Sequence, residues 1–412
     1  MKFNIVNILL AFLCVIKITA HSKFFKINLV DGEHYLTTMG QSNDLFLNIV
    51  RYGNNDIEYE SLSKKEEVFY VFSNLLFSTF LAQPITHEFG HQSVLNEVGI
   101  GSISKPFLDK NLVARVTGVT DATLMDLRDN NLSNYIRLHT GGLESDYTYL
   151  KKSDAFFNFN EENAKGVKLD YFMRKLGTVF YYLSYKFPEK KINEFDEDEL
   201  NRDIVGHDIY GMVRHLHRPS MNFYRYTEFD SLTLDEKNYV KRMGYLSLLN
   251  FINPNVWMCN GYDLNDNLKA NFSVNYSLTP FGDFTEQNAY LLIKEKYKIN
   301  PYFRQYFNKN QIFLAGGVNL HNYCFNNEKF ILNSSIDLWN QPKNLDFRTD
   351  ESRFGFGIKS EIGFRFANWN EKNKSAYINI GSSYKTNGFI PEVPSLREDF
   401  KVHLGFIISS KQ

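Results

Sequence analysis

The feature that most constrains this chain is a two-residue alternation of apolar and polar side chains through its C-terminal part. In residues 353–366 the even positions are apolar apart from Ser360, and the odd positions are charged or glycine. The same alternation recurs in residues 271–278, 330–338 and 400–409. Because successive side chains of a strand point to opposite faces, this pattern predicts an antiparallel sheet with one apolar and one polar face.

Eight strands of this kind are predicted, and each has about the length that a tilted strand needs to cross a bilayer. Short and longer links alternate between them, as in a meander of neighbouring strands. The strands are expected near residues 270–279, 285–298, 300–308, 311–323, 328–339, 352–367, 374–385 and 399–410.

Residues 261–412 therefore resemble the small outer-membrane β-barrels of Gram-negative bacteria, which are apolar outside and polar inside. This resemblance rests on the pattern of side chains and not on a sequence motif. It implies a closed eight-stranded barrel with a filled interior, and outer-membrane lipid as a partner. A soluble antiparallel sheet or lipocalin-like barrel remains the alternative, because alternation alone does not say which face points inward.

The first 20 residues have a basic start, an apolar run and a small residue, Ala20, at a plausible cleavage point. This order predicts a secretory signal peptide over residues 1–20 and places the chain in the cell envelope. Cys259 and Cys324 are the cysteines that remain after cleavage. They form one disulfide, or they are two small buried apolar residues; their spacing favours neither.

Residues 21–260 carry apolar side chains at helical spacing, so we expect an α+β protein whose helical domain precedes the barrel. The formal net charge is −1 and no basic stripe is visible, which argues against nucleic acid as a partner. The apolar run 68–82 is shorter than the roughly 20 residues of a membrane span and predicts a buried core helix. Further helices are expected over residues 124–138, 143–150, 169–185, 200–216 and 234–250.

The helical part contains the sequence His87-Glu88-Phe89-Gly90-His91. Two histidines four apart lie on one face of a helix, so both imidazoles can bind one zinc ion. Glu88 between them is placed to act as the general base for a water molecule activated by the ion. The five residues resemble the HExxH motif of zincin metallopeptidases. The resemblance implies Zn²⁺ as cofactor, His87 and His91 as ligands, and Glu88 as the catalytic residue.

The third metal ligand must come from elsewhere in the chain. The metzincin extension fails, because Val94 replaces its glycine and Glu97 replaces its third histidine. Gluzincin-like families take a glutamate from a later helix, and the best match here is Glu144. The glycines at 141–142 just before it would let that helix approach the metal helix closely.

Two histidines are rivals for the third position. Thr148 stands where the gluzincin pattern has an aspartate, so His139 and His207 remain candidates beside Glu144. His207 is expected on a helix with Asp203 four residues earlier, a spacing that suits a ligand and its carboxylate partner.

These observations favour a zinc-dependent peptidase of the bacterial envelope, with a periplasmic helical domain, a membrane barrel, and peptides or proteins as substrates. A secreted or periplasmic protein is the alternative location. The alternative function is a non-catalytic outer-membrane barrel with a helical interaction or plug domain. A third reading, an intramembrane protease, is disfavoured because long uninterrupted apolar segments are scarce.

Overall fold

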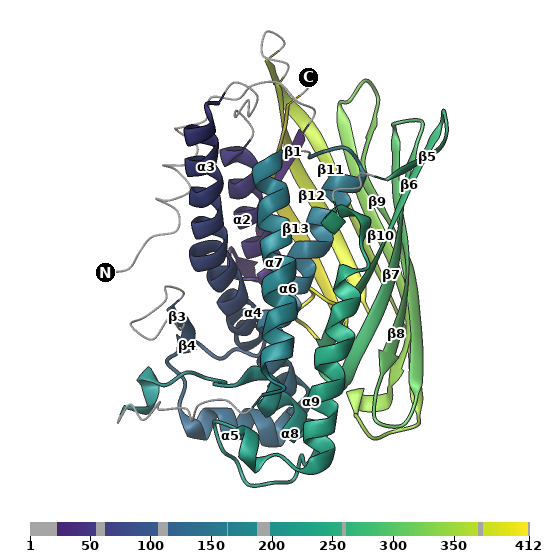
Figure 1. Ribbon diagram of the computed structural model, residues 1–412. Coiled ribbons are helices and arrows are strands. Elements are labelled where there is room, and N and C mark those ends of the chain that lie inside the picture. Colours follow the sequence, from purple (N-terminus) through teal and green to yellow (C-terminus); the bar gives the residue numbers. More distant parts are fainter. Residues whose placement is uncertain are drawn as a thin grey trace.

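The computed structural model of this 412-residue chain describes residues 23–54, 62–105, 114–162, 164–187, 198–257, 261–369 and 374–410. The predicted signal peptide and Cys259 lie outside the described residues. The fold is α+β, with helices packed against one face of a large curved antiparallel sheet (Figure 1).

The sheet has 11 strands in the order β2-β1-β13-β12-β11-β10-β9-β8-β7-β6-β5, and neighbouring strands are antiparallel. The eight strands expected from alternation are β6 to β13, so this prediction is confirmed. Their bounds, after β5 (Tyr262–Asn265), are β6 (Leu268–Thr279), β7 (Gly282–Ile293), β8 (Tyr297–Phe307), β9 (Ile312–Phe325), β10 (Phe330–Pro342), β11 (Ser352–Trp369), β12 (Lys374–Lys385) and β13 (Asp399–Ser410).

The sheet is open, and it does not form the closed eight-stranded barrel that was expected. Two strands from the N-terminal part, β1 (Lys23–Asp31) and β2 (His34–Tyr35), extend it beyond β13. Helix α2 (Met39–Gly53) then covers the free edge of β1. The side chain of Asn48 donates to Lys26 O at 2.6 Å, and that of Arg51 donates to Phe24 O at 2.7 Å. Edge carbonyls that would pair with another strand are thus satisfied by a helix.

The opposite edge, along β6, is covered in a similar way. The side chain of Asn250 forms two hydrogen bonds with the backbone of Tyr276. Its Oδ1 accepts from Tyr276 N at 3.1 Å, and its Nδ2 donates to Tyr276 O at 3.3 Å. The Val274 amide donates to Ile252 O at 2.9 Å. Asn250 and Ile252 belong to the segment after helix α9 (Leu234–Leu246). Helical parts of the chain therefore cover both edges of the sheet, and the sheet does not need to close on itself.

The polar face of the sheet points toward the helices, and the apolar face points outward. Helix α6 (Leu132–Asn158) is buried along most of its length and packs on β6 and β7. The sequence left the direction of the two faces undecided, and packing decides it. Buried polar residues of the inner face include Ser273, Asn275, Glu286, Asn288, Asn300, Arg304, Glu361, Asn379, Lys401 and His403.

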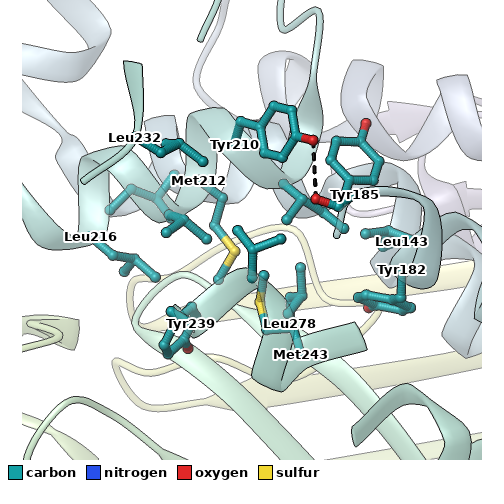
Figure 2. Packing of buried hydrophobic residues seen from close by; sticks show 14 of the residues in the cluster. Leu143, Tyr182, Tyr185, Tyr210, Met212, Leu216, Leu232, Tyr239, Met243 and Leu278 are labelled. Atoms are coloured by element: carbon teal, nitrogen blue, oxygen red, sulfur yellow. Dashed lines mark hydrogen bonds between the residues drawn. The ribbon is translucent and has the colours of Figure 1, made fainter. Parts of the chain in front are cut away.

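The remaining helices form the body beside the sheet. A core of apolar side chains joins α6, α7, α8, α9 and β6, and Tyr210 donates from its hydroxyl to the Tyr185 carbonyl there at 3.0 Å (Figure 2). α6 is one continuous helix through residues 141–142, where two separate helices were expected. The other elements are α3 (Lys64–Phe77), η2 (Ser78–Ala82), α4 (Gln83–Glu97), β3 (Ile103–Lys105), β4 (Arg115–Thr117), α5 (Asp121–Asn130), α7 (Lys165–Ser184), η3 (Glu199–Asn201), α8 (Asp208–His217), η4 (Phe229–Ser231), α9 (Leu234–Leu246), η5 (Ser247–Phe251), η6 (Pro254–Trp257) and η7 (Lys343–Leu345).

Helix α3 contradicts the prediction of a buried core helix over residues 68–82. None of its residues is buried. It continues through a π-helical turn, η2, into α4, where Pro84 sits in the first turn. The resulting helical run Lys64–Glu97 has 34 residues and is long and apolar enough to cross a membrane, with 17% of its most apolar window buried.

Candidate metal centre

The metal-binding candidates His87 and His91 lie on α4, and they meet Asp208, the first residue of α8. Their ligand atoms all lie within 4.8 Å of one another. Asp208 Oδ2 is 3.2 Å from His87 Nε2 and 3.5 Å from His91 Nε2. His91 and Asp208 are buried, and His87 is nearly so. This group could hold a metal ion.

The second nitrogen of each imidazole is bonded away from the cluster. His91 Nδ1 lies 2.6 Å from the Leu138 carbonyl oxygen, which can only accept, so Nδ1 carries the hydrogen. His87 Nδ1 lies 2.9 Å from Asp146 Oδ2. Such outer partners hold the rings of metal-binding histidines in one orientation and tautomer. Both Nε2 atoms are therefore left to point at the same place beside Asp208.

The two separations from Asp208 Oδ2 to the histidine nitrogens fit a tetrahedral ion. Bonds of roughly 2.0–2.1 Å to nitrogen and oxygen place neighbouring tetrahedral ligands about 3.3 Å apart. The separations of 3.2 Å and 3.5 Å from Asp208 Oδ2 to the two histidines lie on either side of that value. Two imidazoles and one carboxylate are also a donor set that zinc accepts, with a fourth position open.

Glycines allow α4, which carries both histidines, to touch α6. A Cβ atom on Gly90 of α4 would overlap the carbonyl of Gly141 on α6. A Cβ atom on Gly142 would overlap the imidazole of His87. The expectation that the glycine pair permits close approach to the metal helix is confirmed. At these positions any larger residue would push the helices apart.

Charges of opposite sign meet in the cluster, and Asp208 carries the negative one. Burial alone would raise the pKa of this carboxyl, but the charge of His91 and the hydrogen bonds from both histidines hold it well below its usual range. The Tyr181 hydroxyl also donates to Asp208 Oδ2 at 2.9 Å, and the Tyr185 hydroxyl donates to Tyr181 at 2.9 Å. Asp208 is thus held as a carboxylate, the form that binds a cation.

Glu88, the expected general base, is buried on α4 beside the cluster. Its carboxylate interacts electrostatically with His91, His87 and Asp208. Among the described residues no hydrogen-bond donor pairs with this carboxylate. Burial raises the pKa of the Glu88 carboxyl, although the charges of the two histidines oppose the shift.

Glu144, expected as the third ligand, has a different contact. Its two carboxylate oxygens accept from Arg137, at 2.9 Å from Nε and 2.5 Å from Nη2. The backbone amide of Glu392 also donates to Glu144, at 2.9 Å. Glu144 therefore ties α6 to the segment before β13, and Asp208 holds the place beside the two histidines. Because α6 is continuous through the glycine pair, Glu144 lies within this helix instead of near the start of a new one.

The two rival histidines lie outside the cluster. The buried ring of His139 stacks on His215, with ring centroids 5.7 Å apart. The ring of His207 packs against Tyr185 and Tyr210, just before α8 begins. The expected helical pairing with Asp203 is wrong, because residues 203–207 are not helical. Asp208 directly follows His207, so the segment that contains this rival histidine supplies the carboxylate of the cluster.

Comparison with protein families, with curated proteins and with solved structures found no match. The site is therefore defined by the geometry of the cluster.

Proposed function

We propose that this protein is a zinc-dependent peptidase of the bacterial envelope, with His87, His91 and Asp208 as metal ligands and Glu88 as general base. One observation carries the proposal. Two Nε2 atoms from one helix converge on a buried carboxylate, while Glu88 of the same helix stays without a hydrogen-bond donor among the described residues. Zinc is the ion that best matches this mixture of nitrogen and oxygen donors at tetrahedral spacing.

The residues around the cluster divide the chemical work. When bound, zinc would supply a water molecule acidic enough to lose a proton near neutral pH. Glu88 would be the residue that accepts this proton and later returns it to the leaving amine. Asp146 and the Leu138 carbonyl keep the two imidazoles in place throughout. Tyr181 orients the Asp208 carboxylate.

The experiment compares the purified wild-type chain with Glu88→Gln. Both are loaded with zinc, their metal content is measured, and each is incubated with a mixture of unstructured peptides. We expect one zinc ion per chain in both proteins. We expect hydrolysis by the wild type alone, since loss of a general base typically costs about 10²–10⁴-fold in rate. Equal zinc content with equal cleavage by both proteins would refute the peptidase.

A non-catalytic role is the second candidate, and a particular observation favours it. Helix α6 fills the concave side of the sheet, and its Tyr147 hydroxyl donates to Glu286 of β7 at 2.6 Å. A helical unit packed this closely on the polar face of the sheet is also the arrangement expected of a plug domain. Absence of cleavage by the wild type, with zinc bound, would favour this second function.

A further inference from the structure

The molecule exposes apolar side chains on opposite sides. On α3 the exposed fractions of Val68, Phe69 and Phe72 are 69%, 72% and 55%. The sheet lies on the other side of the body in Figure 1. A single protein partner bound to one side would leave the apolar residues of the other side exposed to water. The exposed apolar residues of the sheet include Phe303, Leu314, Val318, Ile336, Leu338, Phe354, Phe356, Ile358, Ile362, Phe364, Phe366, Ile378, Ile380, Phe400, Val402, Leu404 and Phe406.

Helices join the two edges of the open sheet. From the β1 edge, α2 leads to α3, where the Asn54 side chain, just after α2, donates to Asn74 Oδ1 at 3.2 Å. α3 packs on α7, and α7 packs on α9 and η5. The η5 segment and Ile252 after it cover the edge of β6. The sheet and these helices thus form a continuous series of contacting elements around α6.

Beyond their first turns, the outward side of these helices is apolar as well, and the charged residues in the middle of α7 point inward. On α7 the residues Asp170, Arg174 and Lys175 are buried. The outward side of α7 carries the exposed Phe180 and a stripe of half-buried residues, which are Leu169, Phe172, Met173, Leu176 and Leu183. α2 adds half-buried Leu45, Phe46 and Ile49, and η5 with the residue after it adds exposed Leu248 and Ile252. We call this outward surface of the sheet, α2, α3, α7 and η5 the apolar perimeter.

Between its apolar clusters, the interior behind the apolar perimeter holds many buried polar and charged side chains, more than a water-soluble fold usually buries. Lys175 donates to Asn275 of β6 at 2.6 Å, and Lys26 of β1 pairs with Glu361 of β11. A cavity of about 330 Å³ lies between α2, α6 and the inner face of the sheet, and charged residues such as Asp44 and Lys152 line it. Polar interiors with apolar exteriors are typical of proteins whose outside meets hydrocarbon.

The height of the apolar perimeter matches a bilayer. Residues 68–82 of the α3–η2 run carry no charge, and at 1.5 Å per residue they rise about 21 Å. The outward positions of β11 from Phe354 to Phe366 are also uncharged, and they span about 28 Å if the strand is tilted by 45°. The apolar band of outer-membrane proteins is about 25 Å tall.

We propose that the sheet and the helices α2, α3, α7 and η5 are embedded in a lipid bilayer, with hydrocarbon chains covering the apolar perimeter. The helices α3 and α7 then contact lipid just as the strands do, and the metal cluster of α4 and α8 lies beside α6. This arrangement differs from a periplasmic helical domain carried by a membrane barrel. It rests on the outer surface alone, so it holds or fails independently of peptidase activity.

The test measures lipid contact at single positions. Full-length protein with its native cysteines replaced by serine is reconstituted into phosphatidylethanolamine and phosphatidylglycerol vesicles. Nitroxide labels are attached at Phe69→Cys on α3, Phe180→Cys on α7 and Phe364→Cys on β11. Lys65→Cys, one turn before Phe69 on the same helix, and Asp350→Cys, in the loop before β11, serve as exposed controls. Collision with oxygen, which concentrates in lipid, is compared with collision with a water-soluble nickel chelate.

We expect oxygen to dominate at positions 69, 180 and 364, and nickel to dominate at 65 and 350. Lipid contact at 364 alone would overturn the proposal in favour of a sheet anchor with a helical domain in water. Nickel access at all five positions, or failure of the protein to float with the vesicles, would show that no bilayer covers it. Low access of both probes at 69 and 180 would reveal a protein partner there and would equally refute the proposal.

Discussion

Asp208 Oδ2 lies 3.2 Å from His87 Nε2, although 121 residues separate the two in sequence. Removing this carboxylate should therefore weaken metal binding. We expect Asp208→Ala to lower zinc affinity by more than about 100-fold, because loss of a direct ligand should exceed the 10–100-fold effects of outer partners. Competition with a chromogenic chelator measures the affinity.

Glu144→Gln is the matched control, since Glu144 is as buried as Asp208 but pairs with Arg137. Zinc affinity should stay close to that of the wild type. The protein should be destabilised by about 3–5 kcal/mol, because Arg137 would keep a buried charge without its partner. A large loss of zinc affinity in Glu144→Gln, with none in Asp208→Ala, would identify Glu144 and not Asp208 as the third metal ligand.

Asp146 orients His87 without joining the cluster, so its loss should have a graded effect. We expect Asp146→Asn to lower zinc affinity by about 10–100-fold, the usual effect of removing an outer partner. Asp154→Asn is the comparison, because Asp154 is buried on the same helix and bonds to Tyr171. Isothermal titration with zinc should show a loss of affinity only for Asp146→Asn. Equal losses in the two variants would mean that both substitutions lower zinc affinity by disturbing the fold.

The contact between α4 and α6 depends on Gly142. We expect Gly142→Ala to abolish stoichiometric zinc binding, because the new methyl group would overlap the His87 ring and displace it. Gly53→Ala adds the same methyl group at the last residue of α2, where no atom lies within 4 Å. That variant should bind zinc normally. Zinc content by atomic absorption after gel filtration distinguishes them, and normal zinc content in Gly142→Ala would contradict the packing described here.

The buried His215 predicts a loss of stability in acid. Burial, aided by nearby arginines, lowers the pKa of His215 to about 4, although its hydrogen bond to the Gly211 carbonyl opposes the shift. The unfolded chain binds this proton near pH 6.5, before the folded chain does, so the contribution is complete above pH 6.5 and falls as the pH drops toward 4. The loss amounts to about 3 kcal/mol at most.

Thermal unfolding in detergent between pH 7.5 and pH 4 measures this slope, and His215→Asn isolates the part due to one residue. The variant should lose less stability on acidification than the wild type. Identical slopes for the two proteins would mean that another group, such as a carboxylate, controls the acid transition.

Much of the local structure was predictable because it follows from backbone periodicity. Residues 353–366 alternate so regularly that a strand was the only compatible element, and β11 covers them. The spacing of His87 and His91 placed both rings on one face of a helix, as α4 shows. The glycines at 141–142 pointed to a close contact between helices. In each case the signal spans only a few residues and needs no knowledge of the rest of the fold.

The sequence by itself determined the eight C-terminal strands, the helical setting of HExxH and the closeness of α4 to α6. Tertiary structure alone decided that Asp208 lies beside the two histidines and that Glu144 pairs with Arg137. It also decided that helices cover the edges of an open sheet, that α3 is exposed and that the polar face of the sheet points inward. The physical reason is that periodicity defines which residues share a face, whereas the partner of that face depends on contacts between segments far apart in the chain.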